Sequence, residues 1–324
     1  MEFQHKSVLL QECIDALNIR PDGIYLDGTL GGAGHSSQIA RRLTEGGRLI
    51  GVDRDRTALA VAKERLAPYA DRVTLVHSNF AEIDAILDSL GIPAVDGMLF
   101  DLGVSSPQLD DASRGFSYMA DAPLDMRMDK DDALTAGEVV NTWPQGELRR
   151  ILYDYGEERY APQIAAAICR AREKAPVETT LELVDIIRSA MPAQALREKQ
   201  HPAKRSFQAI RIAVNDELGA VSRMMQAAVG RLNPGGRLAV ITFHSLEDRI
   251  VKHFFDRAAH PERGLDPRLP LTNDMLPKPL FDNIERIKPS EAECEANPRA
   301  RSAILRVGVR TVSPWRPEDG ACAR

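Results

Sequence analysis

The chain has 324 residues, of which 44% are hydrophobic and 27% are charged, and its formal net charge is −5. This length favours two domains, and the composition is ordinary for a globular protein. The charge excludes the strongly basic balance that signals nucleic-acid binding, so any contact with RNA or DNA must come from local basic patches.

The first third of the chain alternates short apolar strands with helices. Four strands are predicted, at residues 24–26, 48–52, 73–77 and 95–100. Three helices separate them, at residues 36–43, 57–66 and 81–90. His35, Ser36 or Ser37 can begin the first of these helices. Strands that alternate with helices indicate a parallel sheet with right-handed crossovers, so we expect an α/β fold.

The middle of the chain lacks convincing strands. Between about residues 108 and 214, helices are predicted at residues 146–155, 162–173, 181–190 and 206–214. The simplest architecture is one discontinuous α/β domain, residues 1–110 and 214–324, interrupted by an inserted all-helical domain, residues 111–213.

The last third returns to the α/β pattern. It is predicted to contain a helix at 216–232, a fifth strand at 237–243 and a helix at 246–259. A proline-rich loop at 260–279 leads to strands at 281–287 and 302–310, which we expect to complete the edge of the sheet. Residues 313–324 are expected to form a loose tail.

Residues suited to a nucleoside ligand end or follow the first four strands. The first strand ends in Asp27 and a glycine-rich turn at 28–34, where glycines let the backbone approach a ligand closely. Asp53 can accept hydrogen bonds from both ribose hydroxyls, Phe80 can pack on a purine, and Asp101 ends the fourth strand. Open α/β sheets bind ligands at this edge, outside the carboxyl ends of their strands.

The spacing of the glycines separates the cofactor classes. A nicotinamide dinucleotide site needs the sequence GxGxxG. Counted from Gly32 and Gly34, the place of the third glycine is taken by Ser37. A P-loop is excluded as well, because its lysine is missing. Asp27, Gly31 and Gly34 instead fit the looser turn of S-adenosylmethionine-dependent methyltransferases. The alternative is that the glycines only tighten a turn and Asp53 caps the next helix, which requires a coincidence at four strand ends. We therefore expect a Rossmann-like methyltransferase sheet.

Longer motifs extend this interpretation. They are HKSVLL at 5–10, DLGVSSPQLD at 101–110, RGFS at 114–117, PLDMRM at 123–128, HPAKRSFQA at 201–209, VNDEL at 214–218, FHSLEDR at 243–249 and NPRARS at 297–302. Together they resemble the RsmH (MraW) family of bacterial 16S rRNA cytosine-N4 methyltransferases. The departures are conservative, such as Ala33 in the glycine turn and Lys204 in the HPA-x-R segment.

The resemblance implies a cytosolic enzyme that uses S-adenosylmethionine to methylate N4 of a cytidine in the decoding centre of 16S rRNA, in the small ribosomal subunit. It implies that the helical insertion recognises the substrate, and it allows a homodimer. Carried over residue by residue, it places the cofactor contacts on Ala33, Gly34, His35, Asp53, Phe80, Asp101 and Gln108.

Methylation of an exocyclic amine needs alignment of the nitrogen with the methyl group and hydrogen-bond acceptors around the nitrogen. Asp101 is followed by Ser105 and Ser106, without the Pro-Pro-aromatic sequence common in such enzymes. We expect the acceptors to come from these three side chains or the nearby backbone. Methylation at cytosine C5 would need a nucleophilic cysteine, usually after a proline, and none of the four cysteines follows one.

His244 ends the fifth predicted strand and has two interpretations. It can contact the base or accept a proton at the same edge of the sheet. Alternatively, His244, Glu247 and Asp248 organise the turn into the next helix, with Ser245 as its N-cap. The sequence favours neither.

Two groups of basic residues could bind phosphates: Lys199, His201, Lys204, Arg205 and Arg211, and then Arg299, Arg301, Arg306 and Arg310. Solvated faces or internal ion pairs are the usual explanation of such groups, and on charge alone we favour that explanation.

The remaining features indicate a cytoplasmic protein. The four cysteines show no CxxC pairing, which suits neither a zinc site nor a disulfide framework, so we expect no metal. No signal-peptide h-region and no apolar run long enough to span a membrane is seen, so we expect no membrane contact.

Overall fold

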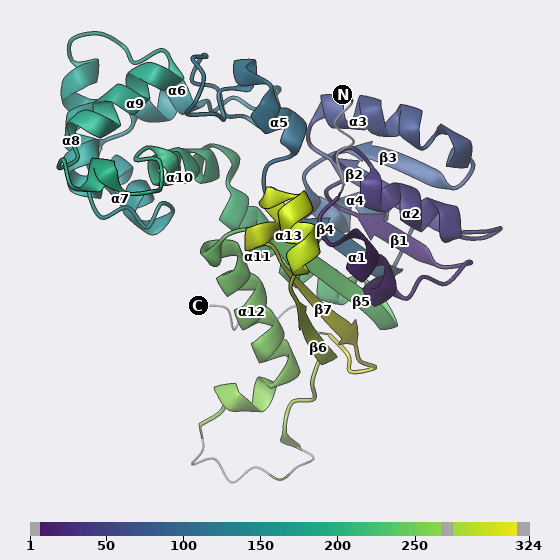
Figure 1. Ribbon diagram of the computed structural model, residues 1–324. Helices are drawn as coiled ribbons and strands as arrows, with labels where there is room; N and C mark the ends of the chain where they lie inside the picture. The colour runs from purple at the N-terminus through teal and green to yellow at the C-terminus, as the bar shows by residue number, and fades with distance from the viewer. Residues whose placement is uncertain (1–6, 267–271, 273–274, 316–324) are drawn as a thin grey trace. The chain divides into compact units, whose positions relative to one another are not determined.

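The computed structural model describes residues 7–266, 272 and 275–315. Parts of the predicted loop at 260–279 and of the predicted tail therefore lie outside the described residues. The chain divides into two compact units (Figure 1). The sheet unit comprises Met1–Gly103 and Leu218–Arg324, and the helical unit comprises Val104–Glu217. Each unit is described by itself.

The sheet unit contains one seven-stranded sheet with the order β3-β2-β1-β4-β5-β7-β6. Its strands are β1 Ile24–Asp27, β2 Arg48–Asp53, β3 Val73–His77, β4 Val95–Asp101, β5 Leu232–Thr242, β6 Phe281–Ile287 and β7 Ile304–Arg310. The first five are parallel, as predicted, whereas β7 runs antiparallel to both β5 and β6. The strand order reverses between β1 and β4, which is the switch point where such sheets bind ligands.

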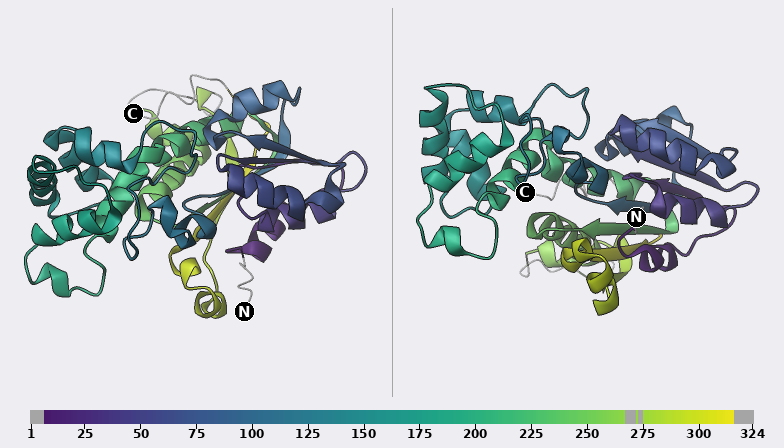
Figure 2. Two further views of the ribbon diagram at one scale, coloured as in Figure 1. Left: turned by 90° about the horizontal axis from the view of Figure 1, so that it is seen from above. Right: turned by 45° about the horizontal axis from the view of Figure 1, so that its top comes forward.

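Helices cover both faces of this sheet (Figure 2). They are α1 Leu10–Leu17, α2 Gly34–Arg42, α3 Arg56–Arg65, α4 Ile83–Ser89, α11 Glu217–Gly230, α12 Ser245–Ala259 and α13 Glu291–Ala296. Successive residues of a strand point to opposite faces. Leu99 accordingly joins the apolar cluster under α1 and α2, while Met98 and Phe100 join the cluster under α4, α11 and α12. The α/β architecture predicted from the sequence is therefore confirmed.

The helical unit has its own apolar core. Its helices are α5 Ser106–Asp110, α6 Ala136–Thr142, α7 Gln145–Asp154, α8 Ala161–Arg172, α9 Thr180–Ser189 and α10 Lys204–Asn215. Capping boxes begin α6, with Thr135 and Glu138, and α9, with Thr179 and Glu182. None of the helices in the described part of the chain is long and apolar enough to cross a membrane.

Asn215 joins α10 to the loop before α6. It is buried, its Oδ1 accepts a hydrogen bond from the Met128 N–H at 2.8 Å, and its Nδ2 donates to the Met126 carbonyl at 2.8 Å. Met126 has a positive φ of 58°, which a methionine adopts only when its surroundings hold it there. Asn215 therefore fixes a strained stretch of backbone.

Replacing Asn215 by Leu is expected to lower the free energy of unfolding of the helical unit by about 2–4 kcal/mol, because it leaves a buried N–H and a buried carbonyl unpaired. Urea unfolding, monitored by hydrogen exchange of amides in α8 and α10, would measure this. The control is Gln163→Leu on the exposed side of α8, which should cost less than about 0.5 kcal/mol. Equal effects of the two substitutions would contradict the role of Asn215.

Candidate active site

Asp27 is a buried carboxyl group at the carboxyl end of β1. Its Oδ2 accepts a hydrogen bond from Ser36 Oγ at 2.6 Å, and its Oδ1 accepts one from the Thr29 N–H at 3.1 Å. Burial raises the pKa of Asp27 to about 6, although these hydrogen bonds oppose the shift. The residue therefore ties the start of α2 to the strand that precedes it.

The glycine-rich turn brings backbone rather than side chains to this edge of the sheet. Gly31 has φ 48° and Ala33 has φ 56°, both in the left-handed region. Ala33 precedes the first residue of α2, and no described side chain caps that helix. The predicted start at His35, Ser36 or Ser37 is wrong, because the left-handed Ala33 begins the helix earlier. The first N–H groups of α2 are left without helical partners, as at any helix N-terminus.

Asp53 links β2 to the glycine-rich turn. Its Oδ2 accepts a hydrogen bond from the Gly31 N–H at 2.7 Å, and its Oδ1 accepts one from the Asp55 N–H at 2.8 Å. The backbone of Arg54 also hydrogen-bonds to this carboxyl group. A carboxylate offers about four acceptor positions, so Asp53 keeps at least one for the ribose hydroxyls. It does not cap the following helix: Asp55 does so, accepting from the Thr57 N–H at 2.9 Å. The structural alternative for Asp53 is therefore wrong.

Phe80 follows β3 and is half-buried. Its ring meets the edge of Phe100 with the centroids 5.9 Å apart. Phe100 in turn fills the space beside Gly28, where a Cβ atom would lie 2.2 Å from its ring. Gly28 thus allows the aromatic pair to lie next to the glycine-rich turn.

Asp101 is the last residue of β4, and its carboxyl group is not fully hydrogen-bonded within the described residues. Its Oδ1 is buried and has no hydrogen-bond partner within the described residues, although 27% of the side chain is exposed. Its N–H donates to Thr29 Oγ1. Burial, followed by the charges of Asp27 and Glu247, raises the pKa of Asp101 to about 8. Asp101 therefore holds a proton at neutral pH.

His35, in the first turn of α2, lies beside Asp101. Its Nε2 donates to the Val8 carbonyl at 3.1 Å, and its Nδ1 lies 3.9 Å from Asp101 Oδ2. Burial lowers the pKa of His35 to about 4, so the ring is neutral and the contact with Asp101 is not an ion pair.

The sheet unit thus brings together Ala33, Gly34, His35, Asp53, Phe80 and Asp101, at the carboxyl ends of β1, β2 and β4 and just after β3. Thr29, whose hydroxyl accepts a hydrogen bond from the Asp101 N–H, was not among the predicted site residues. A threonine inside the glycine-rich turn was the available signal.

His244 caps α12. Its Nδ1 accepts from the Glu247 N–H at 3.5 Å, while Glu247 Oε2 accepts from the Phe243 N–H at 3.0 Å. His244 Nε2 lies 3.1 Å from Glu247 Oε1, without hydrogen-bond geometry. Ser245 is the first helical residue, so its prediction as N-cap is wrong. The structure supports the turn-organising interpretation of His244, and its contact with a base stays a prediction.

Three predicted site residues belong to the helical unit. Ser105 and Gln108 form a capping box at the start of α5: Ser105 Oγ accepts from the Gln108 N–H at 3.4 Å, and Gln108 Oε1 accepts from the Ser105 N–H at 3.0 Å. The side chain of Ser106 lies outside the described part of the structure. The roles of these residues in binding or catalysis stay predictions.

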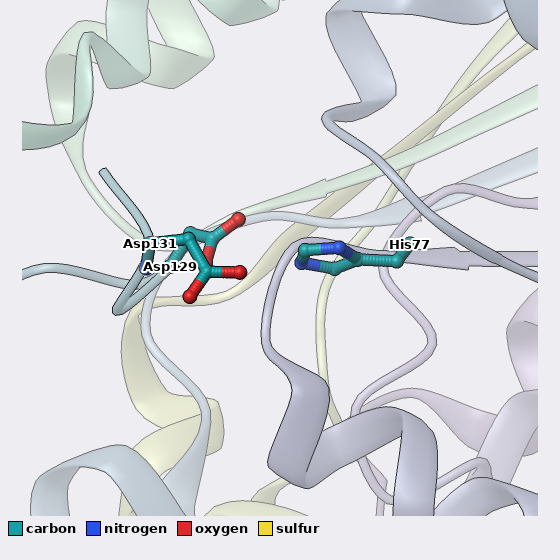
Figure 3. A group of neighbouring side chains, drawn as sticks. All are labelled: His77, Asp129 and Asp131. Carbon is teal, nitrogen blue, oxygen red and sulfur yellow. Dashed lines mark hydrogen bonds between the residues drawn. The ribbon is translucent and has the colours of Figure 1, made fainter.

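His77 ends β3 opposite Asp53 in the sheet, and its Nε2 lies 3.0 Å from the Arg54 carbonyl. Figure 3 shows it with Asp129 and Asp131, which belong to the helical unit. We assign no metal site to residues drawn from both units.

The predicted basic groups are partly internal. Arg306 pairs with Asp248 at 2.8 Å, and Arg310 donates to the carbonyls of Val229 and Ser313. For Arg306 the interpretation as an internal ion pair is confirmed, whereas the hydrogen bonds of Arg310 go to uncharged oxygens. In the helical unit, the ring of His201 stacks on a tyrosine, Tyr118, with centroids 4.5 Å apart.

The chain is similar to known proteins over nearly its whole length. The sequence model of the MraW methylase family matches residues 2–311. The chain is 55% identical to the ribosomal RNA small subunit methyltransferase H of Symbiobacterium thermophilum over 313 residues, which cover 96% of this chain and 98% of that protein. The protein of the same name from Brevibacillus brevis is 54% identical over 314 residues, with 96% and 99% covered.

Proposed function

The chain belongs to the MraW methylase family, whose members are S-adenosylmethionine-dependent rRNA methyltransferases, and we propose that it methylates N4 of a cytidine in the decoding centre of 16S rRNA within the small ribosomal subunit. The observation that carries the proposal is the arrangement of Asp53, Phe80 and Asp101 around the glycine-rich turn. The choice of N4 and of the decoding centre rests on the motifs shared with the RsmH family.

The residues at this edge fit S-adenosylmethionine. The remaining acceptor positions of Asp53 suit the ribose hydroxyls, and the half-buried ring of Phe80 suits the adenine. The uncapped N–H groups that follow Ala33 suit the carboxylate of the methionine part. When bound, the cofactor supplies an electrophilic methyl group on a positively charged sulfur.

The chain's own residues orient the acceptor amine. The unpartnered Oδ1 of Asp101 is the candidate acceptor for a hydrogen bond from N4, and Ser105 and Ser106 are proposed to add further acceptors. Gln108 is proposed to contribute a cofactor contact, and the helical unit to recognise the RNA.

Two other functions would use the same fold: methylation of another nucleic acid or of a small molecule, and assembly of the ribosome without catalysis. The intact set of Asp27, Asp53 and Asp101 favours an active enzyme, because a relic site has no need of three buried or half-buried carboxyl groups.

The test is incubation of the purified protein with labelled S-adenosylmethionine and small subunits from cells that lack the endogenous enzyme. Nucleoside mapping by mass spectrometry is expected to find N4-methylated cytidine in the decoding region. Subunits from cells that contain the enzyme are the control and should accept little label. Label on another nucleoside, or no transfer despite cofactor binding, would contradict the proposal.

A further inference from the structure

The carboxyl group of Asp101 lies among groups that oppose its ionisation. Among the described residues, the titratable groups that face it from β1, α12, α2 and α1 are Asp27, Glu247, His35 and Cys13, and no lysine or arginine is among the causes that shift its pKa. Asp27 and Glu247 disfavour a further negative charge, the His35 ring is neutral, and burial keeps the Cys13 thiol protonated. Oδ1 lacks a hydrogen-bond partner throughout residues 7–266, 272 and 275–315.

A cation bound next to Asp101 would instead favour the ionised form of its carboxyl group. An opposite charge within about 4–6 Å lowers the pKa of a carboxyl group by roughly 1–3 units. The sulfur of S-adenosylmethionine carries one positive charge, whereas S-adenosylhomocysteine, the product, is neutral at the same atom. The two ligands otherwise share their ribose, adenine and amino-acid parts.

We propose that Asp101 is a proton switch set by the charge on the cofactor sulfur: it releases its proton when S-adenosylmethionine binds and takes up the proton that the acceptor amine loses during methyl transfer. The second half rests on the proposed function, because it needs an amine as the methyl acceptor. The first half needs only cofactor binding.

The atoms and charges balance in this scheme. The nitrogen lone pair forms the new N–C bond, and the electron pair of the broken C–S bond stays on sulfur, which becomes neutral. The methylated nitrogen then carries one proton too many, and that proton moves to the Asp101 carboxylate. Because the positive charge on sulfur is lost in the same step, the surroundings again favour the protonated carboxyl group. Each turnover thus releases one proton to solvent, at cofactor binding.

Isothermal titration calorimetry in buffers of different ionisation enthalpy measures this proton directly. At pH 7, a group with a pKa of about 8 is roughly nine-tenths protonated, so we expect release of about 0.4–0.9 proton with S-adenosylmethionine and less than about 0.2 with S-adenosylhomocysteine. Asp27, with a pKa of about 6, holds only about a tenth of a proton at pH 7 and cannot supply that amount.

The variant Asp101→Asn should abolish the difference between the two ligands. A second measurement, on the unaltered protein, tests the proposal without relying on the folding of that variant. As the pH rises from 6 to 7.5, the affinity for S-adenosylmethionine relative to that for S-adenosylhomocysteine should increase by up to about tenfold per pH unit. The reason is that binding of S-adenosylmethionine requires deprotonation of Asp101. Equal proton numbers for both ligands, a flat ratio, or undiminished release in Asp101→Asn would overturn the proposal. A failure to methylate rRNA would overturn the proposed function and leave the calorimetric result standing.

Discussion

Replacing Asp101 by Asn is expected to lower the rate of methyl transfer by about 10²–10⁴-fold, because asparagine keeps an oxygen acceptor but cannot take up a proton. The affinity for S-adenosylmethionine should fall by about 2- to 100-fold at pH 7, because a pKa that binding lowers by 1–3 units adds a factor of that size to the affinity of the unaltered protein. Single-turnover transfer to small subunits measures the first quantity, and calorimetry measures the second.

The matched control is Asp71→Asn, which removes an exposed carboxylate that pairs with its neighbour Arg72. It should leave both quantities unchanged. A transfer rate in Asp101→Asn within about threefold of the unaltered protein would show that the amine proton goes elsewhere. His244, the N-cap of α12, would then be the next residue to substitute.

Much of the sheet could be predicted because its strands are apolar runs between turn signals. The predicted ranges for β3 and β6 agree with the structure, and the other strands differ mainly at their ends. The antiparallel direction of β7 could not be predicted, since the run of apolar residues reads the same in either direction. The helices α1, α5, α6 and α13 were not predicted, and each has eight residues or fewer. In α1 a signal was present and missed, because Cys13, Ile14 and Leu17 form a buried face at helical spacing.

The predicted starts of two helices were wrong because their N-cap residues are unusual. Serine is a preferred N-cap and alanine is not, so the sequence favoured Ser245 and the serines after Ala33. In the structure His244 is the N-cap of α12, and Ala33, in the left-handed region, is the N-cap of α2. Left-handed backbone is expected at glycine or asparagine, and nothing in the sequence marks Ala33 for it.

The position of the site could be predicted from the sequence, but the protonation state of its carboxyl groups could not. Parallel strands end at one edge, so residues that end β1, β2 and β4 must lie near one another. The protonation of Asp101 depends instead on burial and on Glu247, which lies far along the chain at the start of α12. Such a shift follows from packing between distant segments, which strand patterns do not describe.

Replacing Asp53 by Ala is expected to weaken binding of S-adenosylmethionine by about 10²–10³-fold. Two hydrogen bonds from ribose to a charged group contribute about 3–4 kcal/mol together, and the substitution also frees the Gly31 N–H from the carboxylate. Calorimetric titration measures the loss. Asp55→Ala is the control two residues away: it removes the cap of α3 and costs about 1 kcal/mol of stability, but should leave cofactor affinity unchanged.

The ligand dependence of this loss separates Asp53 from Asp101. Ribose is common to S-adenosylmethionine and S-adenosylhomocysteine, so Asp53→Ala should weaken both by the same factor. Asp101→Asn should instead weaken only the charged ligand, because its effect depends on the sulfur. If Asp53→Ala discriminated between the two ligands by more than about threefold, its carboxylate would be acting through charge rather than by binding the ribose. The assignment of the two ends of the cofactor to β2 and β4 would then be wrong.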